Sequence, residues 1–357
     1  MKLLHAADFH LDAPFRRLPA PQAAQRRREL RQLPSRLAAL AREEGAQLVL
    51  LPGDLFDGER VYPETLRALA DALGEIPAPV VIAPGNHDFC RPGGPYDAVT
   101  WPDNVHIFTA AQLTALPLPE LGCVVHGCAF TAPRREDDPL SGFSAPADGR
   151  LHLLCLHGEV TAQGSVYAPI SPAALERSGV HYAALGHIHA CSGLQRAGGT
   201  AWAYPGCPEG RGFDECGEKG ALLLDLDASG ARARFLPLCR RQYRVERVEL
   251  GDFDAALAAC PPEDLVRWVL TGQSDAPPDL ADLAARAQAR SFYAEVRDET
   301  TLPQSLWARR EEDSLTGLFL REMARRLEQC EEADRPRLLL AARFGLAALE
   351  GGEDIRP

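Results

Sequence analysis

The segment LGHIHA, residues 185–190, places two histidines two residues apart, the first directly after a glycine. In an extended chain, residues i and i+2 point to the same side, so His187 and His189 can present two imidazoles to one point. Neutral imidazole is the most common side-chain metal ligand. Two histidines in a surface loop would show the same spacing, so the pair indicates a metal site only if other ligands converge on it.

Four more clusters of metal-binding residue types occur in the chain, each at or just after the end of a short apolar run. They are Asp8 and His10 after KLLHAA, Asp54 and Asp57 after AQLVLLPG, Asn86, His87 and Asp88 after APVVIAPG, and His157 after LHLLCL. Apolar runs of this length fit strands that are covered on both faces. Helix-like segments at 23–44, with a break near Pro34, and at 63–75 lie between the early runs, which indicates a layered α/β domain. Ligand sites in such sheets lie beyond the carboxyl ends of the strands, so we expect the five clusters to share one site.

The chemistry of the combined set favours a borderline divalent ion such as manganese, iron or zinc, because its donors are carboxylates, imidazoles and an amide. The candidate ligands are Asp8, His10, Asp54, Asn86, His157, His187 and His189. This set is too large for one ion with open positions, but two ions with a shared carboxylate would use it. Paired ions about 3.5–4 Å apart can clamp the attacking and leaving oxygens of a phosphoryl transfer.

Composition limits the setting in which this chemistry takes place. The net charge of −12 argues against a surface coated with nucleic-acid contacts, although a local basic track remains compatible with it. No apolar run approaches the ~20 residues of a membrane span, and Asp8 comes too early for a signal peptide. The ten cysteines form no CxxC pair and are expected to be free thiols. We therefore predict a cytoplasmic protein that does not engage a membrane.

The pattern changes after a predicted hairpin at residues 219–238. Strands are predicted at 243–250, 265–271 and 291–297, and helices at 252–259 and 279–290, the latter capped by Asp279. Residues from Pro303 onward are rich in charge and are predicted to be helical. An apolar stripe is expected on one helix, formed by Leu315, Leu318, Phe319, Met323, Leu327 and Cys330. The segment 337–349 is apolar almost all round and should be buried.

Taken in order, the motifs D-x-H, G-D-x-x-D, G-N-H-D, H-G and G-H-x-H resemble those of the calcineurin-like metallophosphoesterase superfamily. The stretches LHAADFHLDAPF, LPGDLFDG and APGNHDF resemble more narrowly the SbcD-type DNA repair exonucleases, and residues 204–220, YPGCPEGRGFDECGEKG, are similar to the YhaO-like branch. The resemblance covers residues 1–240 strongly, and beyond them it rests on layout. It implies a four-layer α-β-β-α sandwich at 1–240, a small α+β capping domain at 241–302 and a helical region at 303–357.

The resemblance also implies roles for individual residues. Asp8, His10 and His189 would hold the first ion, Asn86, His157 and His187 the second, and Asp54 both. The ions would be Mn²⁺, with Fe²⁺, Zn²⁺ or Mg²⁺ as alternatives, and they would activate a water molecule. His87 would protonate the leaving oxygen and Asp88 would orient His87. Two readings stay open for Asp57, which supports a metal ligand or caps a helix, and for Arg211, which binds a substrate phosphate or forms a loop salt bridge.

The implied function is that of a metal-dependent DNA exonuclease in DNA repair. A small-molecule phosphodiesterase or phosphomonoesterase is the alternative, because the fold hosts both. A non-catalytic scaffold subunit is a third reading, against which the complete ligand set argues. Phosphoprotein substrates are less favoured, because Gly58-Glu59 follows Asp57 where protein phosphatases of the superfamily usually have Arg-Gly.

The expected partners are DNA and an SMC-like coiled-coil ATPase. DNA contacts are expected from the arginines within residues 16–31 and from residues 241–300, although a solvated helix face would also account for these arginines. The ATPase is expected to dock on the C-terminal helices. The alternative is that these helices pack on the protein's own body, and a homodimer is also compatible with the sequence.

Overall fold

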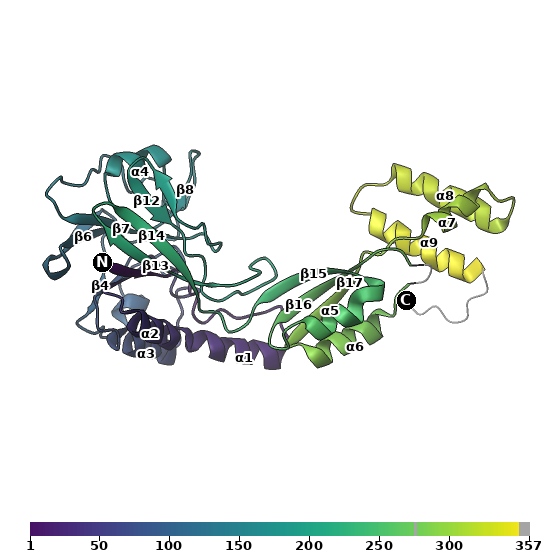
Figure 1. Ribbon diagram of the computed structural model, residues 1–357, viewed down its shortest axis with the longest axis horizontal. Helices are drawn as coiled ribbons and strands as arrows, with labels where there is room; N and C mark the ends of the chain where they lie inside the picture. The colour runs from purple at the N-terminus through teal and green to yellow at the C-terminus, as the bar shows by residue number, and fades with distance from the viewer. Residues whose placement is uncertain (275–276, 350–357) are drawn as a thin grey trace. The chain divides into compact units, whose positions relative to one another are not determined.

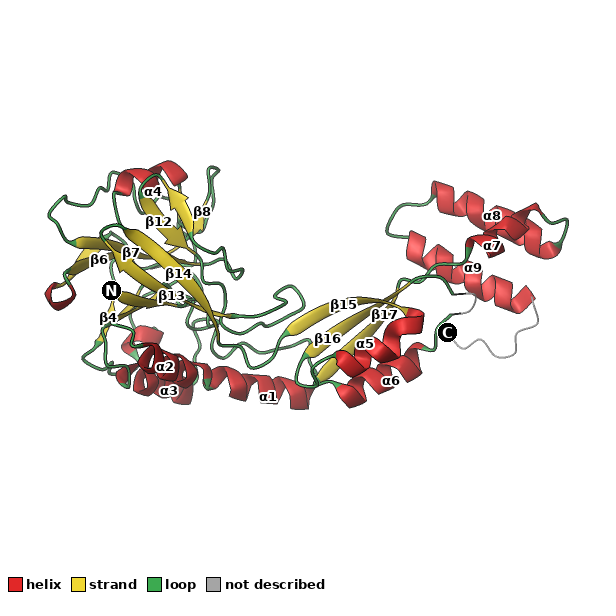
Figure 2. Ribbon diagram, in the orientation of Figure 1, coloured by secondary structure: helices red, strands yellow, loops and turns green. Residues whose placement is uncertain are grey.

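The computed structural model describes residues 1–274 and 277–349. The chain divides into two compact units, Met1–Gln242 and Tyr243–Pro357. Figure 1 labels their helices and strands, and Figure 2 distinguishes helix from strand in the same view.

The first unit contains two six-stranded sheets. In spatial order, the first sheet is formed by β14 (Gly230–Pro237), β13 (Gly220–Asp227), β1 (Lys2–His5), β2 (Leu48–Leu51), β3 (Val80–Ile82) and β4 (Val105–Ile107). The second is formed by β11 (Gln195–Ala197), β12 (Thr200–Ala203), β10 (Tyr182–Gly186), β7 (Leu151–His157), β6 (Cys123–Gly127) and β5 (Thr114–Leu118). A separate pair consists of β8 (Glu159–Val160) and β9 (Pro169–Ile170).

Helices cover the outer faces of the two sheets. The helices of this unit are α1 (Ala20–Arg31), α2 (Leu33–Glu44), α3 (Pro63–Gly74), α4 (Pro172–Ser178) and the short 3₁₀ helices η1 (Pro95–Asp97) and η2 (Pro119–Leu121). The predicted break near Pro34 is confirmed, because α1 ends at Arg31 and Pro34 occupies the first turn of α2, where its missing N–H costs nothing.

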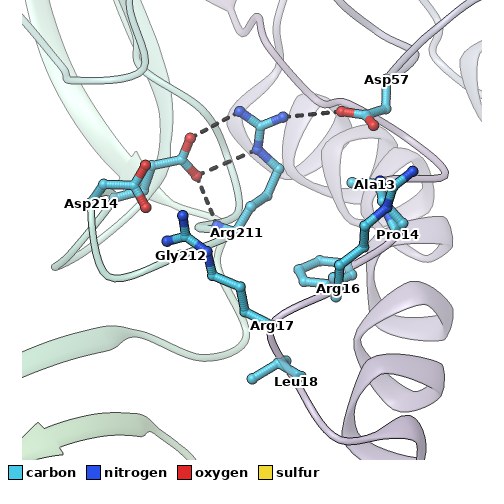
Figure 3. Close-up of a pocket in the computed structure, with 11 residues that line it drawn as sticks. Ala13, Pro14, Arg16, Arg17, Leu18, Asp57, Arg211, Gly212 and Asp214 are labelled. Carbon is cyan, nitrogen blue, oxygen red and sulfur yellow. Dashed lines mark hydrogen bonds and ion pairs between the residues drawn. The ribbon is translucent and has the colours of Figure 1, made fainter.

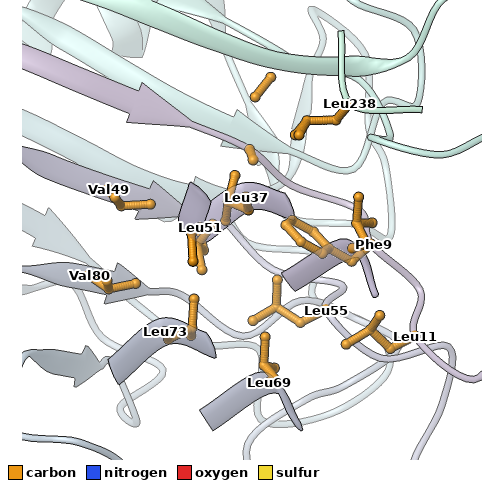
Figure 4. Packing of buried hydrophobic residues seen from close by; sticks show 14 of the residues in the cluster. Phe9, Leu11, Leu37, Val49, Leu51, Leu55, Leu69, Leu73, Val80 and Leu238 are labelled. Atoms are coloured by element: carbon orange, nitrogen blue, oxygen red, sulfur yellow. The ribbon is translucent and has the colours of Figure 1, made fainter. Parts of the chain in front are cut away.

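Three apolar clusters separate the layers of the first unit. One, drawn in Figure 4, joins strand residues such as Val49 and Leu51 to helix residues such as Leu37 and Leu69. A second lies between the sheets and includes Leu50 of one sheet. A third joins the second sheet to α4. Because the strands are covered on both faces, their continuous apolar runs have a physical reason, and the predicted four-layer α-β-β-α sandwich is confirmed.

Strand direction then determines where the polar clusters lie. β1, β2 and β3 are parallel neighbours in the first sheet, and β7 and β10 are parallel neighbours in the second. The five predicted clusters lie at or just after the carboxyl ends of these strands. The sheets come close at this edge, since a Cβ added to Gly186 would lie 1.9 Å from the carbonyl oxygen of Pro52. Only glycine lets β10 approach the loop after β2 so closely.

The second unit begins with a three-stranded parallel sheet in the order β15-β16-β17. Its elements are β15 (Tyr243–Glu249), η3 (Leu250–Asp252), α5 (Phe253–Ala259), β16 (Leu265–Thr271), α6 (Leu280–Arg290) and β17 (Tyr293–Asp298). They agree with the predicted elements to within two residues, and the Asp279 carboxylate accepts hydrogen bonds from the backbone N–H groups of Ala281 and Asp282, as expected of a cap. One face of the sheet packs against α5 and α6 through Trp268.

The remaining elements of this unit are helical: α7 (Gln304–Ala308), η4 (Arg309–Glu311), α8 (Leu315–Gln329) and α9 (Arg335–Leu349). A small core of Leu302, Leu320, Met323, Ala342 and Leu346 joins α8, α9 and the end of the sheet segment. Buried Arg343 donates hydrogen bonds to Asp298 and Thr300. The helices thus pack on each other and on their own unit. In the described part of the chain no helix is long and apolar enough to cross a membrane.

The predicted single stripe on α8 is wrong in its composition. Met323 and Leu327 are buried together with Leu320, but Leu315 and Leu318 are 68% and 58% exposed. The buried row follows the spacing 320, 323 and 327, so the residues at 315 and 318 lie on a different face. An apolar pattern identifies which residues avoid water, but it does not distinguish a face packed internally from one that remains exposed.

Candidate metal centre

The five clusters converge at one edge of the sandwich. Within this site, ligand atoms of Asp8, His10 and His189 all lie within 4.8 Å of one another, and so do those of Asp8, Asp54 and His157. These residues come from the loops after β1, β2 and β10 and from the end of β7. Asn86 and His187 lie beside His157, as described below. The structure therefore brings together all seven side chains that the sequence proposed as ligands.

In one half of the site, two histidines face each other. The Nε2 atoms of His10 and His189 are 3.2 Å apart, and His10 Nε2 is 3.7 Å from Asp54 Oδ2. His10 is almost fully buried, and in the described part of the chain its Nδ1 atom has no hydrogen-bond partner. Converging lone-pair donors with little access to water are the arrangement that a divalent cation requires.

In the other half, His157 lies opposite two oxygens. Its Nδ1 is 3.0 Å from the carbonyl oxygen of Pro52, which can only accept, so Nδ1 carries the proton. Its Nε2 then has a lone pair, which faces Asn86 Oδ1 at 3.0 Å and Asp54 Oδ2 at 3.5 Å. A cation between these three acceptors would remove their repulsion. The same Asp54 oxygen faces both halves, which fits a bridging carboxylate.

His187 completes this half. Its ring centroid lies 5.2 Å from that of His157, and its backbone N–H donates to the Asp8 carboxylate at 3.0 Å. That hydrogen bond joins the loop after β10, in the second sheet, to the loop after β1, in the first sheet.

Electrostatics also favour a cation at this site. Burial raises the pKa of Asp8 well above its usual value, and the nearby Asp54 carboxylate raises it further. Burial raises the pKa of Asp54 as well. Burial lowers the pKa of His157 and of His187 to about 4, which keeps both imidazoles neutral. Neutral imidazoles and crowded carboxylates are the forms that bind a divalent ion, and the ion would offset the repulsion between the carboxylates.

The backbone at the site adopts conformations that L-residues avoid. Asp8, His10, Asp54 and His187 have φ values of 57°, 46°, 51° and 110°. Such conformations cost free energy and persist where surrounding contacts hold them, as at many functional sites. Gly85 is required for a related reason: a Cβ there would lie 2.2 Å from Asp54 Oδ1. The loops are therefore shaped around the cluster.

The expected contact between Asp88 and His87 is not the one that forms. The His87 ring is exposed, and its Nδ1 lies 3.1 Å from the carbonyl oxygen of Asp57. Asp88 is fully buried and accepts hydrogen bonds from the backbone N–H groups of Asp54, Leu55, Phe56 and Gly85 and from the Tyr96 hydroxyl. Asp88 therefore holds the second and third loops together, and the carbonyl of Asp57 orients the imidazole.

The structure also separates the readings left open for Asp57. Its Oδ1 lies 3.2 Å from His10 Nδ1 and 3.2 Å from Arg211 Nη1, while the N-cap of α3 is Tyr62. Asp57 therefore supports a candidate ligand rather than capping a helix. Its approach to His10 has an ion-pair distance, but its alignment falls short of a hydrogen bond.

Arg211 combines features of both its readings. It pairs with Asp57 and Glu215, and it also lines a cavity of about 320 Å³ beside the site, together with Arg16 and Arg17 (Figure 3). The phosphate-binding role predicted for Arg211 stays a prediction.

Sequence reasoning missed Glu215. Its Oε1 lies 2.7 Å from His189 Nδ1, and its carboxylate also accepts hydrogen bonds from the Arg211 side chain and backbone. Burial opposes ionisation, but the hydrogen bonds from His189 and Arg211 outweigh it and hold the pKa of Glu215 below its usual range. The available signal was its position four residues after Arg211 in the segment RGFDE.

Comparisons with known proteins agree with this arrangement. The uncharacterized metallophosphoesterase YhaO of Bacillus subtilis is 32% identical over 239 residues, which is 63% of this chain and 57% of that protein. The DNA double-strand break repair protein Mre11 of Aeropyrum pernix is 29% identical over 70% of this chain and 64% of its own length. The Mre11 protein of Methanopyrus kandleri is 24% identical over 64% of this chain and 55% of its own length. The chain thus spans less than two thirds of each of these relatives.

The family model named calcineurin-like phosphoesterase matches residues 1–191, which include all five clusters. This match covers more than half of the chain, and it agrees with a two-sheet sandwich whose strand ends carry a buried or half-buried set of carboxylates, imidazoles and an amide. The chain therefore belongs to the calcineurin-like phosphoesterase family.

Proposed function

We propose that this chain is a two-metal DNA nuclease, acting as an exonuclease in DNA repair with Mn²⁺ as its metal. The nuclease activity is supported by the two relatives named as DNA double-strand break repair proteins. The alternative is a small-molecule phosphodiesterase or phosphomonoesterase, for which the same centre would suffice. The two functions differ in what lies beside the centre.

The observation that carries the nuclease proposal is the pair Arg16 and Arg17. Both are exposed, both line the cavity beside the candidate metal centre, and neither forms an ion pair or hydrogen bond within the described residues (Figure 3). A second cavity, which shares Arg16 with the first, also includes Arg60 and Arg91. Guanidinium groups beside the reacting phosphate can hold further phosphates of a strand, whereas a small diester has no use for them.

The proposed reaction assigns separate roles to the bound ions and to His87. Two divalent ions bound here would polarise the phosphate and activate a water molecule. His87 stands beside His10, with ring centroids 4.8 Å apart, and its Nδ1–H donates to the carbonyl of Asp57. This hydrogen bond leaves Nε2 available, and a proton on Nε2 can be donated to the leaving oxygen. Asp54 holds the His87 backbone N–H at 2.9 Å, which fixes this ring relative to the centre.

We further propose that an SMC-like coiled-coil ATPase docks on α8 and α9. Leu315 and Leu318 of α8 are exposed, and so is Leu340 of α9, at 42%. The internal faces of both helices are already occupied by their shared core. Exposed leucines on a pair of packed helices offer an apolar surface of the kind that a coiled coil can cover.

The metal content tests the two-ion centre. Metal-free protein equilibrated with Mn²⁺ and freed of excess should contain about two ions per chain by elemental analysis, because the ligand set fills two partly open shells around one shared carboxylate. Asn86→Ala removes an oxygen that faces only the His157 half and should lower the content toward one ion. Gln163→Ala, in an exposed loop, is the control. One ion in the parent protein, unchanged in Asn86→Ala, would contradict the model.

The role of His87 is tested by separating binding from catalysis. His87→Ala should retain the parent metal content yet lose activity on bis-p-nitrophenyl phosphate and on DNA by roughly 10²–10⁴-fold, the usual effect of removing a positioned acid. Asp54→Ala should lose metal itself, because Asp54 faces both halves of the centre. Cleavage by His87→Ala at the parent rate would exclude the assigned role.

The substrate is tested through Arg16 and Arg17. The double variant Arg16→Ala, Arg17→Ala should bind linear DNA more weakly, and the dependence of its binding constant on salt should become shallower because fewer counterions are released. Its hydrolysis of bis-p-nitrophenyl phosphate should stay at the parent rate. Arg177→Ala with Arg232→Ala, two exposed arginines outside both cavities, controls for net charge. If the parent protein cleaves nucleotide diesters efficiently but neither binds nor cuts DNA at low salt, the alternative function is correct.

The docking surface is tested by co-purification with a coiled-coil SMC-like ATPase from the same organism. Leu315→Ser with Leu318→Ser should abolish capture, because it makes the exposed face polar, while metal content and diester hydrolysis are unchanged. Val245→Ser, at an exposed apolar position of the small sheet, is the matched control. Capture of the double variant at the parent level would rule out this surface.

A further inference from the structure

The contacts around His189 assign a role to a residue outside the candidate ligand set. We propose that Glu215, braced by Arg211, is a positioning residue that fixes the tautomer and orientation of His189 and so determines how tightly the first metal position binds its ion. The first metal position here means the one formed by Asp8, His10 and His189. The inference rests on the proposed metal centre, but not on DNA as the substrate.

The argument begins with the proton on His189. Its Nε2 faces His10 Nε2 at 3.2 Å, and its Nδ1 lies 2.7 Å from Glu215 Oε1. A carboxylate only accepts, so this short contact requires the proton on Nδ1. The lone pair is then on Nε2, the atom that faces the centre. An imidazole with the opposite tautomer would direct an N–H toward the metal position and could not bind.

Arg211 holds the Glu215 carboxylate in place against His189. Its Nη2 donates to the same Glu215 oxygen at 2.9 Å, and its backbone N–H donates to the other oxygen at 2.8 Å. Arg211 Nη2 also lies 3.0 Å from His189 Nδ1, but a guanidinium and a protonated Nδ1 both donate, so this approach is not a hydrogen bond. The shared acceptor is Glu215 Oε1, and the two donors lie side by side against it.

The same guanidinium reaches the other histidine of this position. Arg211 Nη1 pairs with Asp57 Oδ1, as the dashed line in Figure 3 marks, and that oxygen lies 3.2 Å from the otherwise unpartnered Nδ1 of His10. Both imidazoles therefore have a carboxylate on the side away from the centre, and Arg211 joins the two carboxylates. Mutation of a carboxylate that accepts a hydrogen bond from a metal-binding histidine typically lowers metal affinity or activity 10–100-fold.

The loop that carries Glu215 is itself held in place. The Glu215 backbone N–H donates to the carbonyl of Gly212, which turns the chain so that residues 211 and 215 meet. Fully buried Arg26 of α1 donates to Glu209 and to the carbonyl of Gly210, just before this turn. With only a tenth of its side chain exposed, Glu215 has little freedom to leave His189.

The proposal is tested without DNA, by calorimetric titration of metal-free protein with Mn²⁺. Glu215→Ala should weaken one of two binding steps by about 10–100-fold, and Glu215→Gln, which keeps an acceptor but loses the charge, should fall between it and the parent. Asp214→Asn alters the exposed neighbouring carboxylate and should bind Mn²⁺ like the parent. Parent affinity in Glu215→Ala would overturn the proposal. So would equal weakening of both steps, which signals a general loss of structure.

A second measurement reads the tautomer directly. In long-range ¹H–¹⁵N spectra of metal-free protein with labelled histidine, the His189 signals, assigned by their loss in His189→Ala, should be those of the Nδ1–H form. In Glu215→Ala they should move toward the Nε2–H form, and a purely structural contact would not produce this change. The same tautomer in both proteins would overturn the proposal. Both readouts use Mn²⁺ or the protein alone, so a failure here is distinct from a failure to cut DNA.

Discussion

The repulsion between buried carboxylates is the constraint on which the rest of this structure depends. Asp8, Asp54 and Asp88 are all nearly inaccessible to water and lie within one cluster. Burial raises the pKa of each, and the Asp54 carboxylate raises the pKa of Asp8 and Asp88 further. A cluster of this kind is costly unless each carboxylate meets donors or a cation. The fold supplies the donors through backbone N–H groups of the loops that follow the strands.

Each of the three carboxylates meets the backbone of a different loop. Asp8 accepts from the N–H of His187, Asp54 accepts from the N–H of His87, and Asp88 accepts from four backbone N–H groups. Two of these donating residues, Asp54 and His187, have positive φ values, so their hydrogen bonds to carboxylates help to hold strained backbone in place. The same loops carry the imidazoles of the site. Asp8 and Asp54, which face the candidate metal positions, each accept from the backbone N–H of one residue, fewer than the four that donate to Asp88.

The sequence was informative where one physical rule acts alone. Buried parallel strands need apolar residues on both faces, so the runs ending near Asp8, Asp54, Asn86, His157 and His187 could be recognised, and their carboxyl ends share an edge by topology. Helix limits followed from Pro34 and Asp279 for equally local reasons. The small sheet could be divided into elements, although its parallel order depends on contacts between residues far apart in sequence.

The sequence was uninformative where partners are chosen in three dimensions. Apart from its spacing from Arg211, nothing local distinguishes Glu215 from the adjacent Asp214, yet Glu215 is buried against His189 and Asp214 is exposed. Asp88 adjoins His87 in sequence, and this suggested that the two side chains interact. Successive side chains in a turn point apart, however, and the Asp88 carboxylate accepts hydrogen bonds from the loop after β2 instead. On α8, the helical period identified apolar residues correctly but could not say that Leu315 and Leu318 would remain outside the shared core.

Net charge was the least reliable guide to possible binding surfaces, because it does not show which charged side chains are paired internally and which are exposed. Among the arginines of residues 16–31, Arg26 is fully buried between Glu29 and Glu209, and Arg31 pairs with Asp12. Buried pairs of this kind add little net stability, but they fix relative positions. Here they fix α1 against the segment that leads into Arg211 and Glu215. Arg16 and Arg17 remain exposed beside the centre. A chain of net charge −12 can thus use an arginine for internal positioning and still present others beside the candidate metal centre, because the potential at a site depends on the nearest guanidinium groups rather than on the net charge.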